Sequence, residues 1–379
     1  MMKQLLLLFA LIICVVASRA QNAAESDLTP KYNNEFLTIG VGARALGMSQ
    51  SQVASVGDVT AGYWNPAGLM NMRESIQVAA MHSEYFAGIA KYDYVGIGKS
   101  LDSVSAVSLS LIRFGVDDIP NTTQLIDAGG NVDYSRITQF SAVDYAFVLS
   151  YGHKGLPFLK KSNLSLFHPE TNRIQGFRWG ASAKVIYRHI GDFAQAWGFG
   201  FDAGIQYDVK RWHFGAAARD ITNTFNAWTF NLDDATKQVF EQTGNDIPPN
   251  GLDLTLPRII LGAARDFQIK KISILAEFNA NITTDGKRNT LISSNPISID
   301  PSIGAEVGYN NVIYLRLGAG NVTKATDFDG SNYYTIQPNL GVGLRIKQLT
   351  IDYALSNIGN VSEIQYSNIF SLKYDFVKK

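Results

Sequence analysis

The five histidines are the side chains of this 379-residue chain best suited to metal binding or acid–base chemistry near neutral pH. No two of them have the spacing of zinc ligands on one helix or hairpin. His82 and His189 fall near the ends of predicted strands, where a nearby serine would be needed for a hydrolase, but no nucleophile motif is present. We therefore expect no catalytic residue, no cofactor and no metal site. The five are His82, His153, His168, His189 and His213.

A second set of polar side chains lies in a glycine- and alanine-rich segment, residues 36–69. The segment has neither a sustained helical period nor a clean strand alternation, so we expect it to fill the interior of something larger, as a hatch. One interpretation makes these polar residues a gate. The structural alternative pairs Arg44 with Asp58 inside the lumen, while Asn65-Pro66 fixes a turn. The candidate hatch residues are Arg44, Gly47, Asp58, Trp64, Asn65 and Pro66.

The rest of the chain supplies the larger structure as about fourteen strand candidates, most near the ~9–11 residues that a tilted membrane strand needs. In residues 196–209, for example, Trp197, Phe199 and Phe201 alternate with glycines and Asp202. This period of two gives each strand one apolar and one polar face. The candidates are 75–83, 92–100, 103–113, 140–151, 177–189, 196–209, 212–219, 258–267, 271–282, 299–309, 312–322, 334–346, 349–356 and 366–377.

The connections decide between a soluble sandwich and a barrel. Tight turns at 101–102, 210–211, 268–270, 310–311 and 347–348 alternate with mostly longer segments. That rhythm is typical of outer-membrane barrels, with short periplasmic turns and long outer loops. We therefore predict an all-β fold, a transmembrane antiparallel β-barrel of about 14 strands with the hatch in its lumen, both termini periplasmic and the long loops extracellular. Residues 152–176 break the rhythm, and the longer segments are 114–139, 190–195, 220–257, 283–298, 323–333 and 357–365.

Charged residues on the polar faces would point into the lumen. Because both signs are present, we expect them to pair with one another around a plugged interior instead of lining an ion-selective pore. In the lumen a charge also avoids the cost of facing lipid. The predicted inward charges are Asp144, Arg178, Lys184, Arg188, Asp202, Asp208, Glu277, Glu306, Arg316, Arg345, Asp352, Lys373 and Asp375.

The start of the chain reads as a secretory signal peptide, residues 1–20. Lys3 precedes the apolar run of residues 5–17, and Ser18-Arg19-Ala20 is a small-x-small cleavage site. Residues 21–74 then form the N-terminal extension and hatch, and residues 75–379 the barrel. The single cysteine, Cys14, lies in the signal peptide. The net charge of zero and the hydrophobic fraction of 46% argue against a disordered chain or a nucleic-acid partner.

Two further segments carry signals. In the last strand Phe370, Leu372, Tyr374 and Phe376 alternate with polar residues, which resembles the C-terminal aromatic signature of outer-membrane barrels.

In the outer loop 220–257, Asp233 starts a short predicted helix and a Pro-Pro turn follows. The loop is either a recognition surface or a lid over the lumen. Its candidate binding residues are Asp233, Phe240, Pro248 and Pro249.

The hatch segment resembles the PorV/PorQ family of Bacteroidota outer-membrane proteins, relatives of the FadL-type barrels. The resemblance implies a 14-stranded barrel in the outer-membrane lipid, with type IX secretion translocon subunits and secreted cargo proteins as partners. Gly47-Met48 is followed by Ser49 where the family often has glycine, and Gly68-Leu69 is more FadL-like. The matching residues are Phe36-Leu37, Gly42-Ala43-Arg44-Ala45, Gly47-Met48, Val53-Ala54, Asp58 and Tyr63-Trp64-Asn65-Pro66-Ala67-Gly68-Leu69.

Three functions follow from these patterns. The leading one is a non-catalytic component of the type IX secretion system that binds or shuttles secreted cargo. The alternative is a FadL-type transporter of hydrophobic small molecules, which needs an apolar pocket between hatch and wall. An outer-membrane enzyme is the weakest. The predicted inward residues are mostly charged, Gly or Ser, which favours the protein-binding role.

Overall fold

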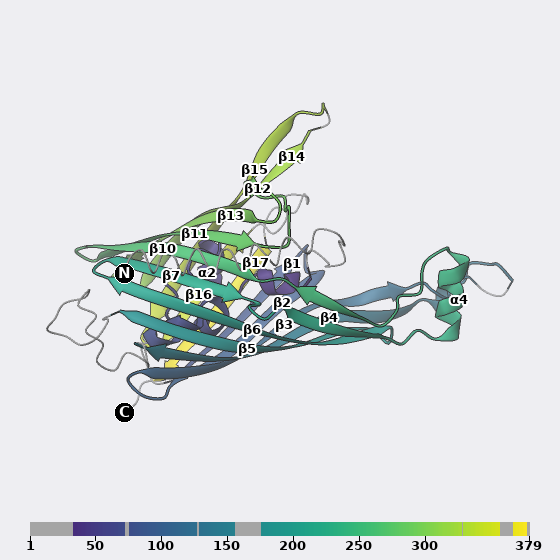
Figure 1. Cartoon of the computed structure of the whole chain (residues 1–379), viewed down its shortest axis with the longest axis horizontal. Coiled ribbons are helices and arrows are strands. Elements are labelled where there is room, and N and C mark those ends of the chain that lie inside the picture. Colours follow the sequence, from purple (N-terminus) through teal and green to yellow (C-terminus); the bar gives the residue numbers. More distant parts are fainter. Residues whose placement is uncertain are drawn as a thin grey trace.

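The computed structural model describes residues 33–72, 76–126, 129–155, 176–327, 329–356 and 367–376. Fourteen antiparallel strands follow one another around a closed barrel, which β1 and β17 complete by pairing with each other (Figure 1). The predicted barrel and its strand number are confirmed. The barrel strands are β1 (Ile76–Tyr85), β2 (Ala90–Ser100), β3 (Ser105–Asn121), β4 (Thr138–Lys154), β5 (Phe177–Ile190), β6 (Ala194–Val209), β7 (Trp212–Arg219), β10 (Arg258–Ile269), β11 (Ile272–Thr283), β13 (Ser298–Tyr309), β14 (Ile313–Thr326), β15 (Asn332–Ile346), β16 (Leu349–Ser356) and β17 (Ser367–Phe376).

The outer surface of the barrel is the apolar face of the strands. On β6, Phe201 is 50% exposed whereas the next residue, Asp202, is 7% exposed on the lumen side. Two groups of aromatic rings bound this apolar surface. Tyr145, Tyr187 and Trp197 meet across three neighbouring strands, with Tyr187 and Trp197 rings 4.7 Å apart. The second group includes Trp179, which lies eight residues before Tyr187 on β5. The two groups are therefore separated by about 26 Å along the strand, a distance that suits aromatic residues at the two interfaces of a membrane.

The predicted loop 114–139 is correct in its middle and wrong at both ends. Strand β3 continues to Asn121 and β4 begins at Thr138, so only residues 122–137 connect them. The register shifts between Val116 and Ile119, where Asp118 adopts a left-handed backbone with φ 58°. Two aspartates and Pro120 are ordinary strand-ending signals, and the bulge is what lets the ladder continue past them.

The predicted loop 220–257 is a kinked extension of the barrel hairpin. After β7 the left-handed residues Asp220 and Asn223 turn the chain, which resumes as β8 (Thr224–Phe230). Helix α4 (Asp234–Gln242) and β9 (Gly251–Thr255) follow. Because β8 pairs with both β6 and β9, this segment extends the sheet outward, with α4 at its tip (Figure 1). The short helix within it is present as predicted. A further short strand, β12 (Ile292–Ser293), pairs with β13.

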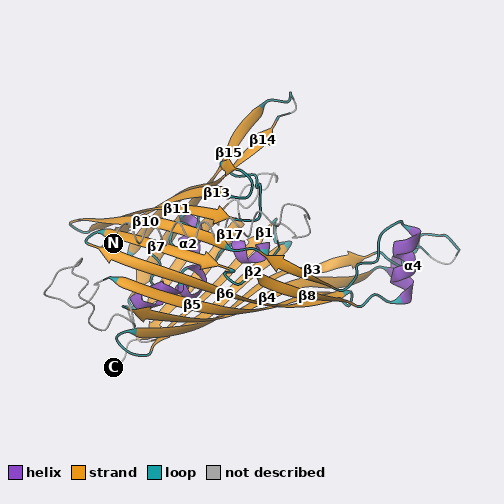
Figure 2. Ribbon diagram, viewed as in Figure 1, coloured by secondary structure: helices purple, strands orange, loops and turns teal. Residues whose placement is uncertain are grey.

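Residues 33–72 lie inside the barrel as short helices joined by turns (Figure 2). None of the helices in the described ranges is long and apolar enough to cross a membrane. The predicted signal peptide, the domain boundary at residue 75, most of the 152–176 connection and the 357–365 loop fall outside the described residues. The helical elements are η1 (Glu35–Thr38), α2 (Ala43–Gly47), α3 (Ala61–Trp64), η2 (Pro66–Asn71) and, between β3 and β4, η3 (Tyr134–Arg136).

Candidate functional site

The hatch, residues 33–72, turns where the sequence predicts, at Asn65-Pro66. Asn65 is extended (φ −160°, ψ 103°), as a residue before proline should be, and Pro66 opens η2. The Asn65 amide donates to the carbonyl of Val53 at 2.9 Å and to that of Ile205, on wall strand β6, at 3.0 Å. This side chain therefore ties two parts of the hatch to the barrel. Trp64 holds a third part, since its indole N–H donates to the Val41 carbonyl at 2.9 Å.

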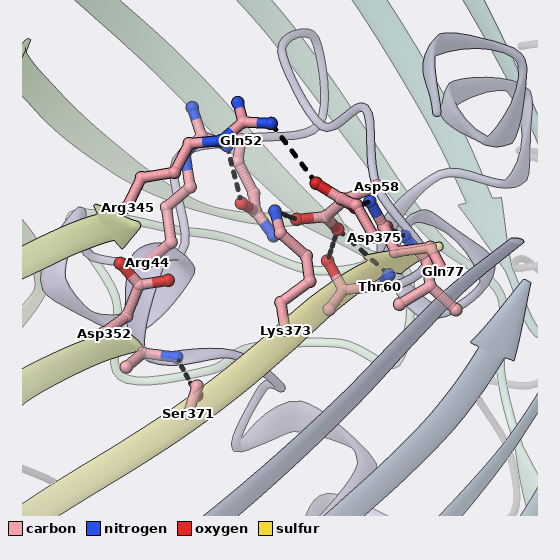
Figure 3. Close-up of polar contacts among 12 residues, drawn as sticks. Arg44, Gln52, Asp58, Thr60, Gln77, Arg345, Asp352, Ser371, Lys373 and Asp375 are labelled. Carbon is pink, nitrogen blue, oxygen red and sulfur yellow. Dashed lines mark hydrogen bonds and ion pairs between the residues drawn. The ribbon is translucent and has the colours of Figure 1, made fainter. Parts of the chain in front are cut away.

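Arg44 and Asp58, the two charged residues among the predicted hatch residues, are paired with the wall. Arg44 Nε lies 2.9 Å from Glu306 Oε2 on β13. Asp58 Oδ2 lies 2.8 Å from Lys373 Nζ on β17 (Figure 3). The predicted Arg44–Asp58 pair is wrong. The sequence could not show which inward wall charges lie at the height of the hatch, because that depends on the register between strands far apart in the chain.

Most of the predicted inward charges pair with one another, as the presence of both signs predicts. Arg316 joins Glu306 to Asp352, and Lys184 lies between Asp202 and Asp220. The exceptions, Glu277 and Lys373, contact the hatch instead. The remaining pairs of predicted inward charges are Arg188–Asp144, Arg178–Asp208 and Arg345–Asp375.

Two buried wall side chains hold the hatch backbone directly. The carboxylate of Glu277, 1% exposed, accepts from the amides of Ala54 and Ser55 at 2.8 and 3.1 Å. The guanidinium of Arg219 donates to the carbonyls of Leu37 and Tyr63 at 3.3 and 2.9 Å. Arg219 was not among the predicted inward charges, although it continues the alternation of Gly215 and Ala217 on β7 and could have been found from it.

Glycines of the wall allow the hatch to approach closely. A β-carbon at Gly180 would lie 2.6 Å from the amide nitrogen of Ala67, and one at Gly304 would lie 2.6 Å from the carbonyl oxygen of Met48. Gly47, a predicted hatch residue, faces Gly341 of β15, where its β-carbon would lie 2.9 Å from the Gly341 α-carbon. The wall and the hatch are therefore in backbone contact on several sides of the barrel.

The lumen has an apolar half and a polar half. On one side Phe36 and Leu37 of the hatch belong to a buried cluster with Tyr85, Tyr92 and Ile112 of the wall. On the other side a cavity of about 340 Å³ separates the hatch from strands β10 to β16. The lining of that cavity is mostly amide and hydroxyl side chains, so it is not the apolar pocket between hatch and wall that a hydrophobic conduit would present.

An aromatic patch lies on the same half of the lumen, at the end of the barrel from which β8 and α4 project. The alternation of β4 and β8 directs Phe140, Trp228 and Phe230 to the lumen side, since Asp144 and Asn226 on the same faces contact Arg188 and Asn34 there. The Phe140 and Phe193 rings lie 5.1 Å apart, and those of Trp228 and Phe230 lie 5.9 Å apart. We call these four residues the aromatic vestibule. No single sequence motif predicts it, because its members come from β4, from β8 and from the connection between β5 and β6.

The candidate outer-loop residues lie around α4. Asp233 caps the helix, accepting from the Thr236 amide at 2.7 Å. Phe240 is half-buried on the helix, and Pro248 and Pro249 follow it, one half-buried and one exposed. The structure thus explains Asp233 as a helix cap and leaves the other three available as surface.

Comparisons with known proteins identify the fold. The toluene transporter TbuX of Ralstonia pickettii superposes with a TM-score of 0.52 and 15% identity, over 89% of this chain and 98% of that one. The toluene transporter TodX of Pseudomonas putida gives 0.53 and 13%, over 90% and 99%. A FadL homologue of Pseudomonas aeruginosa gives 0.51 and 13%, over 89% and 98%.

No protein-family model matches the sequence. No curated protein sequence matches it either. The resemblance of the hatch to the PorV/PorQ family therefore finds no support in these comparisons. At 12–15% identity the structural likeness concerns architecture alone, and the chain has the fold of the FadL-type outer-membrane barrels.

Proposed function

We propose that this chain is an outer-membrane transporter that admits small hydrophobic molecules past the hatch. Its fold is shared with proteins described as toluene transporters. The observation that carries the proposal is the apolar half of the lumen. The aromatic vestibule and the buried cluster of Phe36, Leu37, Tyr85 and Tyr92 lie on this half of the lumen, with the Asp144–Arg188 ion pair between them. Apolar surfaces of this kind replace water around an apolar solute.

Passage requires the hatch to move, because the described lumen holds no apolar channel through it. The polar cavity on the other side is not part of this route. Loosening the Asn65-Pro66 turn, by Asn65→Ala together with Pro66→Gly, should raise the uptake of labelled toluene into intact cells with a lipopolysaccharide outer leaflet. Cells without the protein give the baseline. Equal uptake with the wild type, the variant and no protein would contradict the proposal.

A second candidate is the cargo-binding role in type IX secretion, with translocon subunits and secreted proteins as partners. The observation that favours it is the outward hairpin of β8 and β9 with α4 at its tip, which stands clear of the barrel (Figure 1). Ordered projections of this kind commonly recognise other molecules. Co-purification of secreted proteins with the wild type, and its loss when the hairpin tip is removed, would support this candidate over the transporter.

A further inference from the structure

The polar cavity between the hatch and the wall is a site that the hydrophobic route does not use. It has a volume of about 340 Å³ and lies between the hatch and six consecutive barrel strands, β10 to β16 with β12 excluded. Amide side chains such as Asn281 and Gln337 and hydroxyls such as Ser356 outnumber the apolar residues in its lining. Pockets for small organic ligands begin at roughly this size.

Four lining side chains on β11, β13 and β15 have an oxygen without a hydrogen-bond partner among the described residues: Asn279, Asn281, Asp300 and Asn339. Asn279 is 3% exposed and Asn339 is 7% exposed. Buried polar atoms in folded proteins are nearly always bonded, so four such oxygens around one cavity ask for an explanation. All four are acceptors. A molecule that carries several hydroxyl donors supplies the missing bonds after small rotations of these side chains.

The charges around the cavity cancel. Two arginines and two carboxylates line it, and both arginines face the same hatch carboxylate. Glu35 Oε1 lies 3.1 Å from Arg288 and 3.8 Å from Arg258. An anion would have to compete with Glu35 for the arginines, and a cation would meet the arginines themselves. Ile39 and Leu46 add a small apolar surface, which suits the C–H face of a ring.

We propose that this cavity binds a small, uncharged, hydroxyl-rich molecule, of the class and size of a monosaccharide. The amide and carboxylate oxygens accept from its hydroxyls, the arginines donate to its oxygens, and the hatch forms the floor. The site adjoins the apolar cluster, with which it shares Leu46 and Trp64, and its occupation can be measured without transport.

The test uses the full chain purified in dodecyldimethylamine oxide, a detergent whose headgroup is not a sugar. Saturation-transfer NMR and calorimetry measure binding of D-glucose, of its anionic analogue gluconate and of its cationic analogue glucosamine, with toluene as competitor. We expect saturable binding of glucose, at least tenfold weaker binding of both charged analogues, and no competition by toluene.

Two cavity variants and one control complete the experiment. Asn281→Leu and Gln337→Met remove polar groups from the lining and should each weaken glucose binding at least fivefold. Asn368→Leu, on the outward face of β17, should leave it unchanged. Absence of saturable glucose binding to the wild type overturns the proposal, whatever the variants do. Equal affinity for the charged analogues, or unchanged binding in both cavity variants, overturns it as well. Toluene uptake is a separate assay, so a failure here does not count against the transporter.

Discussion

The guanidinium carbon of Arg219 on β7 lies 4.3 Å from the ring centre of Tyr63 in the hatch. The same side chain donates to the carbonyls of Tyr63 and Leu37, which stand 26 residues apart in the chain. It also lies 5.3 Å from the Trp64 ring. One wall residue therefore fastens both ends of the apolar part of the hatch, and the tyrosine hydroxyl reinforces the arrangement by donating to Leu37 at 2.6 Å.

Removing this fastening should loosen the hatch while the wall stays intact. Arg219→Ala deletes two charge-assisted hydrogen bonds and the stacking on two rings, at a cost of roughly 2–4 kcal/mol in hatch docking. We expect faster proteolysis between residues 36 and 69 and higher toluene uptake. Arg219→Lys retains the charge without the planar fork, so its effect should be intermediate. Proteolysis of the hatch at the wild-type rate in Arg219→Ala would contradict this role.

The close approach of hatch and wall can be tested with a single methyl group. In Gly180→Ala the new β-carbon would lie 2.5 Å from the Pro66 carbonyl carbon and 2.7 Å from the Tyr151 carbonyl oxygen of β4, so the hatch and the wall must move apart, at about 1–3 kcal/mol. Gly251→Ala is the matched control, since its nearest neighbour would be 3.8 Å away. Urea titration of the folded barrel should show a lower midpoint for the first variant and no change for the second. Equal midpoints would mean that the hatch is not packed against β5.

If the outward apolar surface faces lipid, a charged side chain placed on it should destabilise the barrel. Leu317, 56% exposed on β14, faces outward in the part of that strand that pairs with both β13 and β15, whereas Ile126, 55% exposed, lies in the β3–β4 connection. Leu317→Arg should therefore cost about 2–4 kcal/mol of folding into lipid vesicles, and Ile126→Arg close to nothing. Both substitutions would be equally harmless if the apolar surface did not face lipid.

The structure also shows which part of residues 220–257 can be deleted without disturbing the barrel sheet. Deleting all of 220–257 would take away β8, which pairs with β6, and β9, which pairs with β8. Replacing only residues 231–250 with Asn-Gly leaves the sheet intact and removes α4. The transporter reading predicts unchanged toluene uptake and a folded barrel. The cargo-binding candidate would be favoured instead if secreted proteins co-purified with the wild type but not with this variant, and if neither of the two took up toluene.

The barrel was readable from the sequence because each strand carries its own local signal. The alternation in residues 196–209 reappears as β6, and every predicted strand has a counterpart in the closed barrel. The errors in the predicted strand bounds lie where pairing between strands overrides a local sequence signal. Pro120 and the aspartates before it signal a strand end, but pairing with β4 continues the ladder through a bulge.

The sequence indicates which segment forms the hatch, but it does not indicate which wall residues the hatch contacts. Its composition shows that it must pack inside something, whereas the partners of Arg44 and Asp58 depend on which wall residues share its height. Glu306 and Lys373 are separated from them by more than 250 residues of sequence. The polar cavity is equally invisible in the chain, since its walls come from six strands that meet only on closure of the barrel.

The central claim is that passage requires the hatch to move, and a reversible crosslink tests it most directly. Ser51 Oγ in the hatch lies 2.9 Å from Ser302 Oγ on β13, and the only native cysteine, Cys14, stands in the predicted signal peptide. Cysteines at both positions are close enough to form a disulfide. Thr323→Cys with Thr335→Cys, whose hydroxyls are 2.7 Å apart between β14 and β15, is the matched crosslink within the wall. We predict that oxidation lowers toluene uptake at least fivefold in the Ser51/Ser302 variant, that a reductant restores it, and that the wall crosslink has no effect. Uptake that is the same in the oxidised and reduced hatch crosslink would contradict the account.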